Sequence, residues 1–420
     1  MDEERVPRDG AEQDGMMVYI DPNVIHSMAA VSAKKRAGLQ ELQSAAESGD
    51  LEAEYRLGIC YYEGSGGAEQ NDRQAFYWLD QAAEGGHIAA QYGAGLCWAG
   101  GVGTHQDFDR AAELYMAAAE QEYIPAVCEL GLCYEMGRGV PQDKDKALEL
   151  YRTAAEQGFA PAQCRLGFFY YHGIAVKEDN EEAARLFTLA AEQGYPRAQA
   201  LLGECYENGH GVEADPVKAF RLYEEAHRQG YDEGTCSLGE CYDQGIGVTP
   251  DREKAAQLYR QAAEAGDARA LCNLGYCYYQ GIGVEESNET AVEWFQRAVA
   301  AGSHRAEFLL GQCYDHGYGV EQELKRAARL YEAAHLGGYP PATCMLGLCY
   351  ELGRGVEMDK ARAVPLYRQA AERGDARAQC NLGYCYYRGI GVDEDDDKAA
   401  EWFAKSAQQR HPRAMSLLGE

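Results

Sequence analysis

Residues 231–266 read YDEGTCSLGECYDQGIGVTPDREKAAQLYRQAAEAG, and this stretch decides the fold because its pattern returns every 36 residues. Its most regular feature is a Leu-Gly pair, here Leu238-Gly239, which recurs from Leu130-Gly131 as far as Leu418-Gly419. A chain that repeats one short unit so often buries its apolar surface between neighbouring copies. The spacing therefore predicts an elongated solenoid with long continuous faces.

Each unit is predicted to contain two helices, which we name helix A and helix B. With the glycine of Leu-Gly as position zero, apolar or small residues at minus five, minus one, plus two and plus three share one side of helix A. Gly-x-Gly-Val then ends helix A, since glycine accepts the positive φ of a tight turn. An Asp is expected to cap helix B in six repeats, at Asp143, Asp179, Asp215, Asp251, Asp359 and Asp395. In residues 231–266, helix B is expected to pack through Ala255, Leu258, Tyr259, Ala262 and Ala263.

The repeats divide the chain into four predicted parts. Residues 36–49 correspond to a lone helix B, residues 50–410 to ten complete repeats, and residues 411–420 to a truncated helix A of an eleventh. Residues 1–35 lack the repeat and are predicted to form a mobile acidic segment with a weak helix over 24–35. A last helix without a polar cap is expected to expose Met415, Leu417 and Leu418, which favours self-association or a longer parent protein.

The quoted residues closely resemble the Sel1-like repeat, a helix-turn-helix relative of the tetratricopeptide repeat, over nearly the whole chain after residue 36. The resemblance implies an all-α, right-handed superhelical solenoid that serves as a non-enzymatic scaffold or adaptor in protein complexes. The departures are local: Ala94-Gly95 replaces Leu-Gly, Ala175 replaces the second turn glycine, and Gly66-Gly67 stands where Gly-Val is expected.

Positions plus one and plus four of helix A fall opposite the packing side and vary most between repeats. Along the repeats, position plus four holds one tyrosine, then two acids, and then a tyrosine again. Each of the three tyrosines at plus four follows an aromatic at plus one by three residues, a spacing that places the pair on one helical face. If helix A lines the concave side, as in related repeats, these positions form aromatic patches separated by carboxylates. The predicted partner-binding residues are Phe168, Tyr171, Glu207, Asp243, Tyr276, Tyr279, Asp315, Glu351, Tyr384 and Tyr387. The alternative is that the tyrosines only cover the groove between helices.

Several uncommon residues recur at three times the repeat length. Residues 272–279, CNLGYCYY, reappear at 380–387, and Glu293-Trp294-Phe295 reappears at residues 401–403. Recent duplication of a three-repeat block explains this longer period. Whether the surface that it displays is used is a separate question.

The charge balance restricts the partner. Sixty-eight Asp and Glu against 39 Lys and Arg give a formal net charge of −29. Nucleic acid and anionic membrane surfaces are therefore disfavoured, and a protein or peptide with basic and apolar residues is the expected partner. A simply solvated surface accounts for the charge equally well. No run of apolar residues has the length of a membrane span.

The 15 cysteines occupy two phases of helix A, and those five residues apart would be separated by ~7.5 Å along the helix, too far for an undistorted disulfide. The cysteines are therefore expected to be reduced thiols in the core of a cytoplasmic protein. Disulfides between helix A cysteines of neighbouring repeats are the alternative. Some cysteine-rich relatives pair a helix B cysteine with one on the next helix A. This chain lacks the helix B cysteine, which argues against the small-molecule site that the resemblance would otherwise suggest.

No motif calls for catalysis, a metal or a cofactor. The Gly-x-Gly-Val turns follow a helix, whereas nucleotide-binding glycine loops follow a strand. The acidic run at residues 393–397 lacks the spacing of a calcium loop, and the cysteines lack the short spacing of a zinc site. The expected function is a scaffold that binds a partner on the helix A face. The alternative is a regulatory or targeting domain of a larger enzyme-containing protein or complex.

Overall fold

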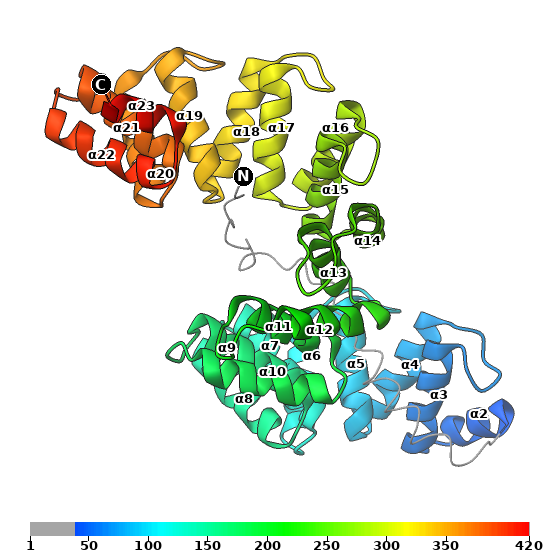
Figure 1. The fold of residues 1–420 in the computed structure, drawn as a ribbon. Coiled ribbons are helices and arrows are strands. Elements are labelled where there is room, and N and C mark those ends of the chain that lie inside the picture. The colour runs from blue at the N-terminus through cyan, green and yellow to red at the C-terminus, as the bar shows by residue number, and fades with distance from the viewer. Residues whose placement is uncertain (1–37, 420) are drawn as a thin grey trace. The chain divides into compact units, whose positions relative to one another are not determined.

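A computed structural model describes residues 38–419. Residues 1–35, predicted to form a mobile segment with a weak helix, and the first two residues of the half-repeat lie outside this range. Within the described residues all regular structure is helical, so the all-α class is confirmed. Helix B of one repeat lies between its own helix A and the helix A that follows, and this pairing is visible along the ribbon (Figure 1).

The chain divides into two compact units that meet at Leu222 and Tyr223, inside one helix, a division that the repeat pattern did not predict. The first unit contains α2 Leu39–Glu47, α3 Leu51–Glu63, α4 Asp72–Glu84, α5 Ile88–Gly100, α6 Phe108–Ala119, α7 Ile124–Met136, α8 Lys144–Glu156, α9 Ala160–His172, α10 Asn180–Glu192, α11 Pro196–Asn208 and the start of α12 Pro216–Arg228.

The second unit contains the rest of α12 and then α13 Asp232–Gln244, α14 Arg252–Glu264, α15 Ala268–Gln280, α16 Asn288–Ala300, α17 His304–His316, α18 Leu324–Leu336, α19 Pro340–Leu352, α20 Lys360–Glu372, α21 Ala376–Arg388, α22 Asp396–Gln408 and α23 Pro412–Gly419. Odd-numbered helices are helix A and even-numbered helices are helix B.

The turn chemistry determines where each helix ends. Helix A stops at a glycine in the left-handed region, for example Gly245 with φ 78°. Asp251 then caps helix B by accepting a hydrogen bond from the backbone N–H of Lys254 at 3.0 Å. All six predicted Asp caps accept such bonds. Ala175 is an exception to the glycine rule, because it holds φ 55° where other repeats place glycine.

The Leu-Gly glycine allows the two helices of a repeat to approach closely. A Cβ added at Gly347 would lie 2.8 Å from the ring of Tyr367, and one added at Gly275 would lie 2.7 Å from the ring of Phe295. Both rings come from helix B of the same repeat and are fully buried. Glycine at position zero is thus a packing requirement, which explains its regularity.

The core follows the predicted phases. The helix B residues predicted to pack, from Ala255 to Ala263, are buried, as are the helix A residues at minus five, minus one, plus two and plus three in the same repeat. All the cysteines lie within the described residues, none of them forms a disulfide there, and every one except Cys60 is buried. The thiols therefore act as small apolar core groups.

Candidate partner-binding surface

The ten predicted binding residues lie in the second half of helix A. Three belong to the first unit, Phe168 and Tyr171 on α9 and Glu207 on α11. Seven belong to the second unit, on α13, α15, α17, α19 and α21.

Two of the acids at plus four, Glu351 and Glu135, accept a hydrogen bond within their own repeat. In the second unit, the hydroxyl of Tyr367 on α20 donates to Glu351 Oε2 at 2.6 Å. In the first unit, the hydroxyl of Tyr151 donates to Glu135 Oε2, also at 2.6 Å. Burial, together with the bond to Glu351, raises the pKa of Tyr367 far above its usual value. These carboxylates therefore hold helix B against helix A.

Asp315 is the predicted site residue that differs most from expectation. Its side chain is only 3% exposed, and its Oδ1 accepts a hydrogen bond from Arg354 Nη2 at 2.8 Å. The carboxylate bonds to this arginine, and the buried hydroxyl of Tyr331 has no hydrogen-bond partner. The expectation that Asp315 lies on an open face is wrong, since position plus four is close to helix B at this repeat.

The alternation at plus four is matched by a second alternation sixteen residues later, on helix B. An acid at plus four precedes Tyr, and a tyrosine at plus four precedes Phe: Glu135 with Tyr151, Tyr171 with Phe187, Glu207 with Tyr223, Asp243 with Tyr259, Tyr279 with Phe295, Asp315 with Tyr331, Glu351 with Tyr367, and Tyr387 with Phe403. Where the helix B residue is phenylalanine, which has no hydroxyl group, helix A carries a tyrosine at plus four in place of the acid.

Tyr171 and Tyr279 each contact both that phenylalanine and the next repeat. The ring centroids of Tyr279 and Phe295 are 6.5 Å apart, and those of Tyr171 and Phe187 are 6.4 Å apart. The Tyr171 hydroxyl also lies 2.6 Å from Nδ1 of His210, in the turn of the following repeat. These contacts favour a structural role for Tyr171 and Tyr279.

Tyr279 makes the equivalent contact to the following turn through its ring. Its centroid lies 5.9 Å from that of Tyr318. Tyr387 differs, because it remains 44% exposed, with the guanidinium of Arg388 over its ring at 4.9 Å. Among the tyrosines at plus four, Tyr387 is therefore the one that offers the most surface to a partner.

The aromatics at plus one form a different surface. Phe168, Tyr276 and Tyr384 are half-buried, and each lies beneath the guanidinium of an arginine from the next helix A. The distances from Cζ to the ring centroids are 5.8 Å for Arg197, 5.5 Å for Arg305 and 4.8 Å for Arg413. Sequence reasoning missed these arginines, although their common place six residues before the Leu-Gly glycine was a visible signal.

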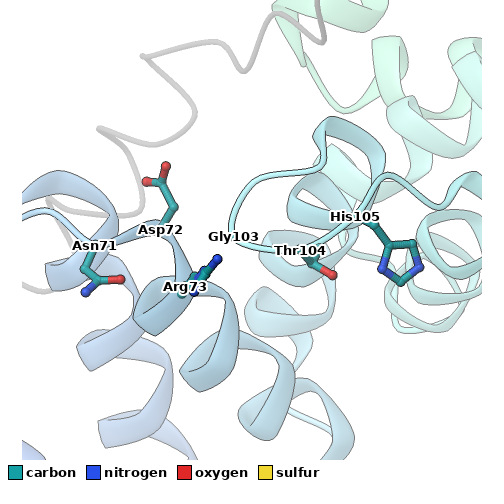
Figure 2. A pocket seen from close by; sticks show the side chains of 6 residues that line it. All are labelled: Asn71, Asp72, Arg73, Gly103, Thr104 and His105. Carbon is teal, nitrogen blue, oxygen red and sulfur yellow. The ribbon is translucent and has the colours of Figure 1, made fainter.

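Two hollows lie on the surface of the described residues. The larger, of about 540 Å³, lies between the start of α4 and the turn after α5, and is lined by Asn71, Asp72, Arg73, Gly103, Thr104 and His105. Its side chains spread around the hollow without converging on one point (Figure 2). The other, of about 320 Å³, lies between α20, near Pro365, and the turn that contains Gly391 and Val392. Neither brings together groups that suggest chemistry.

Across residues 38–419, no three His, Cys, Asp or Glu side chains are grouped so that they could hold a metal ion. No helix in that range is both long and apolar enough to cross a membrane. The arrangement is that of a helical repeat protein whose extended faces are available for contacts with other molecules.

The chain belongs to the Sel1 repeat family, whose model matches ten successive segments: residues 51–87, 88–123, 124–159, 160–195, 196–231, 233–267, 268–303, 304–338, 340–375 and 376–411. No curated protein matches the chain.

Two solved structures extend the comparison. A protective antigen of uropathogenic Escherichia coli that displays the SLR fold is 34% identical, with a TM-score of 0.60 over 91% of this chain and 82% of that one. A Sel1 repeat protein from Oxalobacter formigenes is 30% identical, with a TM-score of 0.52 over 58% of this chain and 96% of that one. Family and fold together support a protein-interaction scaffold in general terms.

Proposed function

We propose that this protein is a non-enzymatic cytoplasmic scaffold that binds a partner protein or peptide on its helix A face. The observation that carries the proposal is the set of aromatic side chains that keep exposed surface there. Tyr276 and Tyr384 are half-buried and Tyr387 is exposed, all on helices of the second unit. Aromatic rings that are rigid and partly exposed are typical anchors of protein interfaces.

The proposed partner segment carries basic and apolar residues. The net charge of −29 attracts basic partners over distance, and an exposed tyrosine ring accepts a cation on its face. The ring of Tyr387 already carries the Arg388 guanidinium at 4.9 Å, which illustrates that contact within the chain. The absence of disulfides among the fifteen cysteines, all of which lie in the described residues, suits a reducing compartment.

The ten residues first predicted to form the surface do not contribute equally. Tyr276, Tyr384 and Tyr387 are proposed as direct anchors in the second unit, and Phe168 is the equivalent in the first. Tyr171, Tyr279 and the carboxylates of Asp315 and Glu351 are proposed to shape the surface through the contacts described above. Glu207 and Asp243 are half-buried and contribute charge beside the anchors.

The test compares two variants of the full chain. One carries Tyr276→Ala, Tyr384→Ala and Tyr387→Ala, and the control carries Tyr77→Ala, a tyrosine on helix B that is 50% exposed. After equal helicity is confirmed by circular dichroism, partners that co-purify from native lysate are compared. A protein held by the wild type and the control but lost from the triple variant supports the proposal. Equal recovery with all three would refute it.

A further inference from the structure

The second unit contains two copies of one side-chain cluster, separated by the 108-residue period. The first copy consists of Arg269, Asn273, Tyr276 and Arg305, and the second of Arg377, Asn381, Tyr384 and Arg413. In each copy the first three residues lie on one helix A and the second arginine comes from the next helix A. That arginine covers the tyrosine ring in both copies.

The first cluster contains an internal carboxylate. Glu240, from the preceding helix A, accepts a hydrogen bond from Asn273 Nδ2 at 3.2 Å, and its Oε1 lies 3.7 Å from Arg269 Nε. Arg269 also donates to Ser237 Oγ at 2.9 Å, and Arg305 donates to Asn273 Oδ1 at 2.7 Å. Both guanidinium groups are thus held in a network around one carboxylate.

The second cluster has no carboxylate at the equivalent place. Leu348 stands where the first cluster has Glu240, and Met345 stands where it has Ser237. Arg377 donates instead to the thioether of Met345 at 3.2 Å, a weak acceptor. Both Arg377 and Arg413 are exposed, and among the described residues no carboxylate lies within ion-pair distance of either guanidinium.

Nearby charges do not replace the missing acid. Asp375, two residues before Arg377, caps α21, where its Oδ1 accepts a hydrogen bond from the backbone N–H of Ala378. Asn381 donates to the Cys344 thiol at 3.8 Å, as Asn273 does to Cys236 at 3.9 Å in the first cluster. The two clusters therefore share their framework and differ in the carboxylate.

We propose that the second cluster binds a side-chain carboxylate, Asp or Glu, of a partner segment, in the place that Glu240 occupies in the first cluster. Arg377 and Asn381 supply N–H donors to that carboxylate, the exposed guanidinium of Arg413 supplies further positive charge, and Leu348 contacts an apolar neighbour of the acidic residue. This inference rests on the proposed function and adds to it. The partner carries one acidic residue beside an apolar one, in addition to its basic and apolar residues.

The first part of the test uses the protein without a ligand. Leu348→Glu supplies the missing carboxylate, and Leu348→Gln is the matched neutral control. The glutamate variant is expected to unfold about 1–2 °C above the glutamine variant at low salt, with the difference lost in 1 M salt. A glutamate variant that is no more stable than the glutamine variant at low salt would overturn the proposal.

The second part uses a displayed library of random heptapeptides, presented either within a loop or with a free C-terminus. The full chain is expected to enrich loop peptides with Asp or Glu beside an apolar residue about tenfold over the Leu348→Glu variant. The variant Glu240→Leu is expected to increase enrichment of the same class, because it opens the first cluster. Acidic enrichment confined to free C-termini, or unchanged by Leu348→Glu, would contradict the proposal.

The outcomes also separate this inference from the proposed function. Enrichment of basic and apolar peptides alone, lost in the Tyr276, Tyr384 and Tyr387 alanine variant, retains the scaffold proposal and rejects the acidic site. Absence of any enrichment by the full chain over the triple alanine variant rejects both.

Discussion

In the repeats that contain Tyr279 and Glu351, the residue at plus four contacts the buried aromatic residue of helix B in two different ways. In the first, a tyrosine on α15 packs against Phe295 of α16. In the second, a glutamate on α19 accepts a hydrogen bond from Tyr367 of α20. The buried ring lies at the same place on helix B in both, and the residue at plus four adapts to whether that ring carries a hydroxyl. Differences in residue type between repeats can therefore reflect contacts within the protein as well as recognition of a partner.

The largest expected effect comes from removing the acceptor in the acid repeat. Glu351→Ala leaves the buried Tyr367 hydroxyl without its bond, and we expect a loss of about 2–3 kcal/mol. Adding Tyr367→Phe should recover most of it, to within about 1 kcal/mol of wild type. Urea unfolding of the full chain, with amide exchange followed in α19 and α20, measures both. Strictly additive losses would show that the two residues are not paired.

The reverse change tests the tyrosine repeat. Phe295→Tyr places a hydroxyl in a fully buried site next to a ring, and we expect a loss of about 1–2 kcal/mol from the unsatisfied group. Tyr279→Glu in the same chain should restore stability, because it recreates the acid and tyrosine pair. The same unfolding assay applies. If Phe295→Tyr alone has no effect, the rule of pairing does not hold in this repeat.

The repeat that contains Glu351 and Tyr367 should also lose stability in alkaline solution. The pKa of Tyr367 is raised from 10.0 by burial and by Glu351, so its phenol stays protonated in the folded state while it ionises in the unfolded chain. Stability is complete below pH 10 and falls above it, by about 1.4 kcal/mol per pH unit for this one group. The variant Tyr367→Phe should lack this contribution to the fall of the unfolding free energy with pH. Unfolding curves between pH 9 and 11 provide the check, and an unchanged slope would contradict it.

The smallest effect on stability is expected at Tyr387. Because its ring is 44% exposed, Tyr387→Ala should cost no more than about 0.5 kcal/mol. Its effect on partner binding should be larger, about tenfold in Kd. Isothermal titration with the purified partner measures the affinity, with Tyr77→Ala as the exposed control. Equal affinity of both variants would remove Tyr387 from the proposed anchors.

Most of the fold was predictable because the repeat imposes strict local chemistry. The glycine turns, the Asp caps and the buried phases of both helices appear where the 36-residue pattern placed them. A periodic chain repeats the same information many times, which makes element boundaries unusually clear. The division at Leu222 and Tyr223 was not predictable, since the repeat runs through α12 without a change in its pattern.

The candidate surface was predicted less completely. Helical periodicity located positions plus one and plus four, but it treats one helix at a time and does not show which neighbour a side chain meets. Asp315 was therefore assigned to an open face although Arg354 of the next turn binds it. The pairing with helix B was readable from residues sixteen positions apart, as Glu351 and Tyr367 illustrate. The arginines near Tyr276 and Tyr384 share a readable place six residues before the Leu-Gly glycine, but the structure was needed to show which ring each of them covers.

The central claim is that exposed aromatics of the helix A face touch a partner protein. Site-specific photocrosslinking tests it most directly, with p-benzoylphenylalanine replacing Tyr387 or, as the control, Tyr77 in the full chain. We predict that the same partner is crosslinked from Tyr387 in native lysate and not from Tyr77. Equal crosslinking of that partner from both positions, or crosslinking from Tyr77 alone, would contradict the assignment of the helix A face.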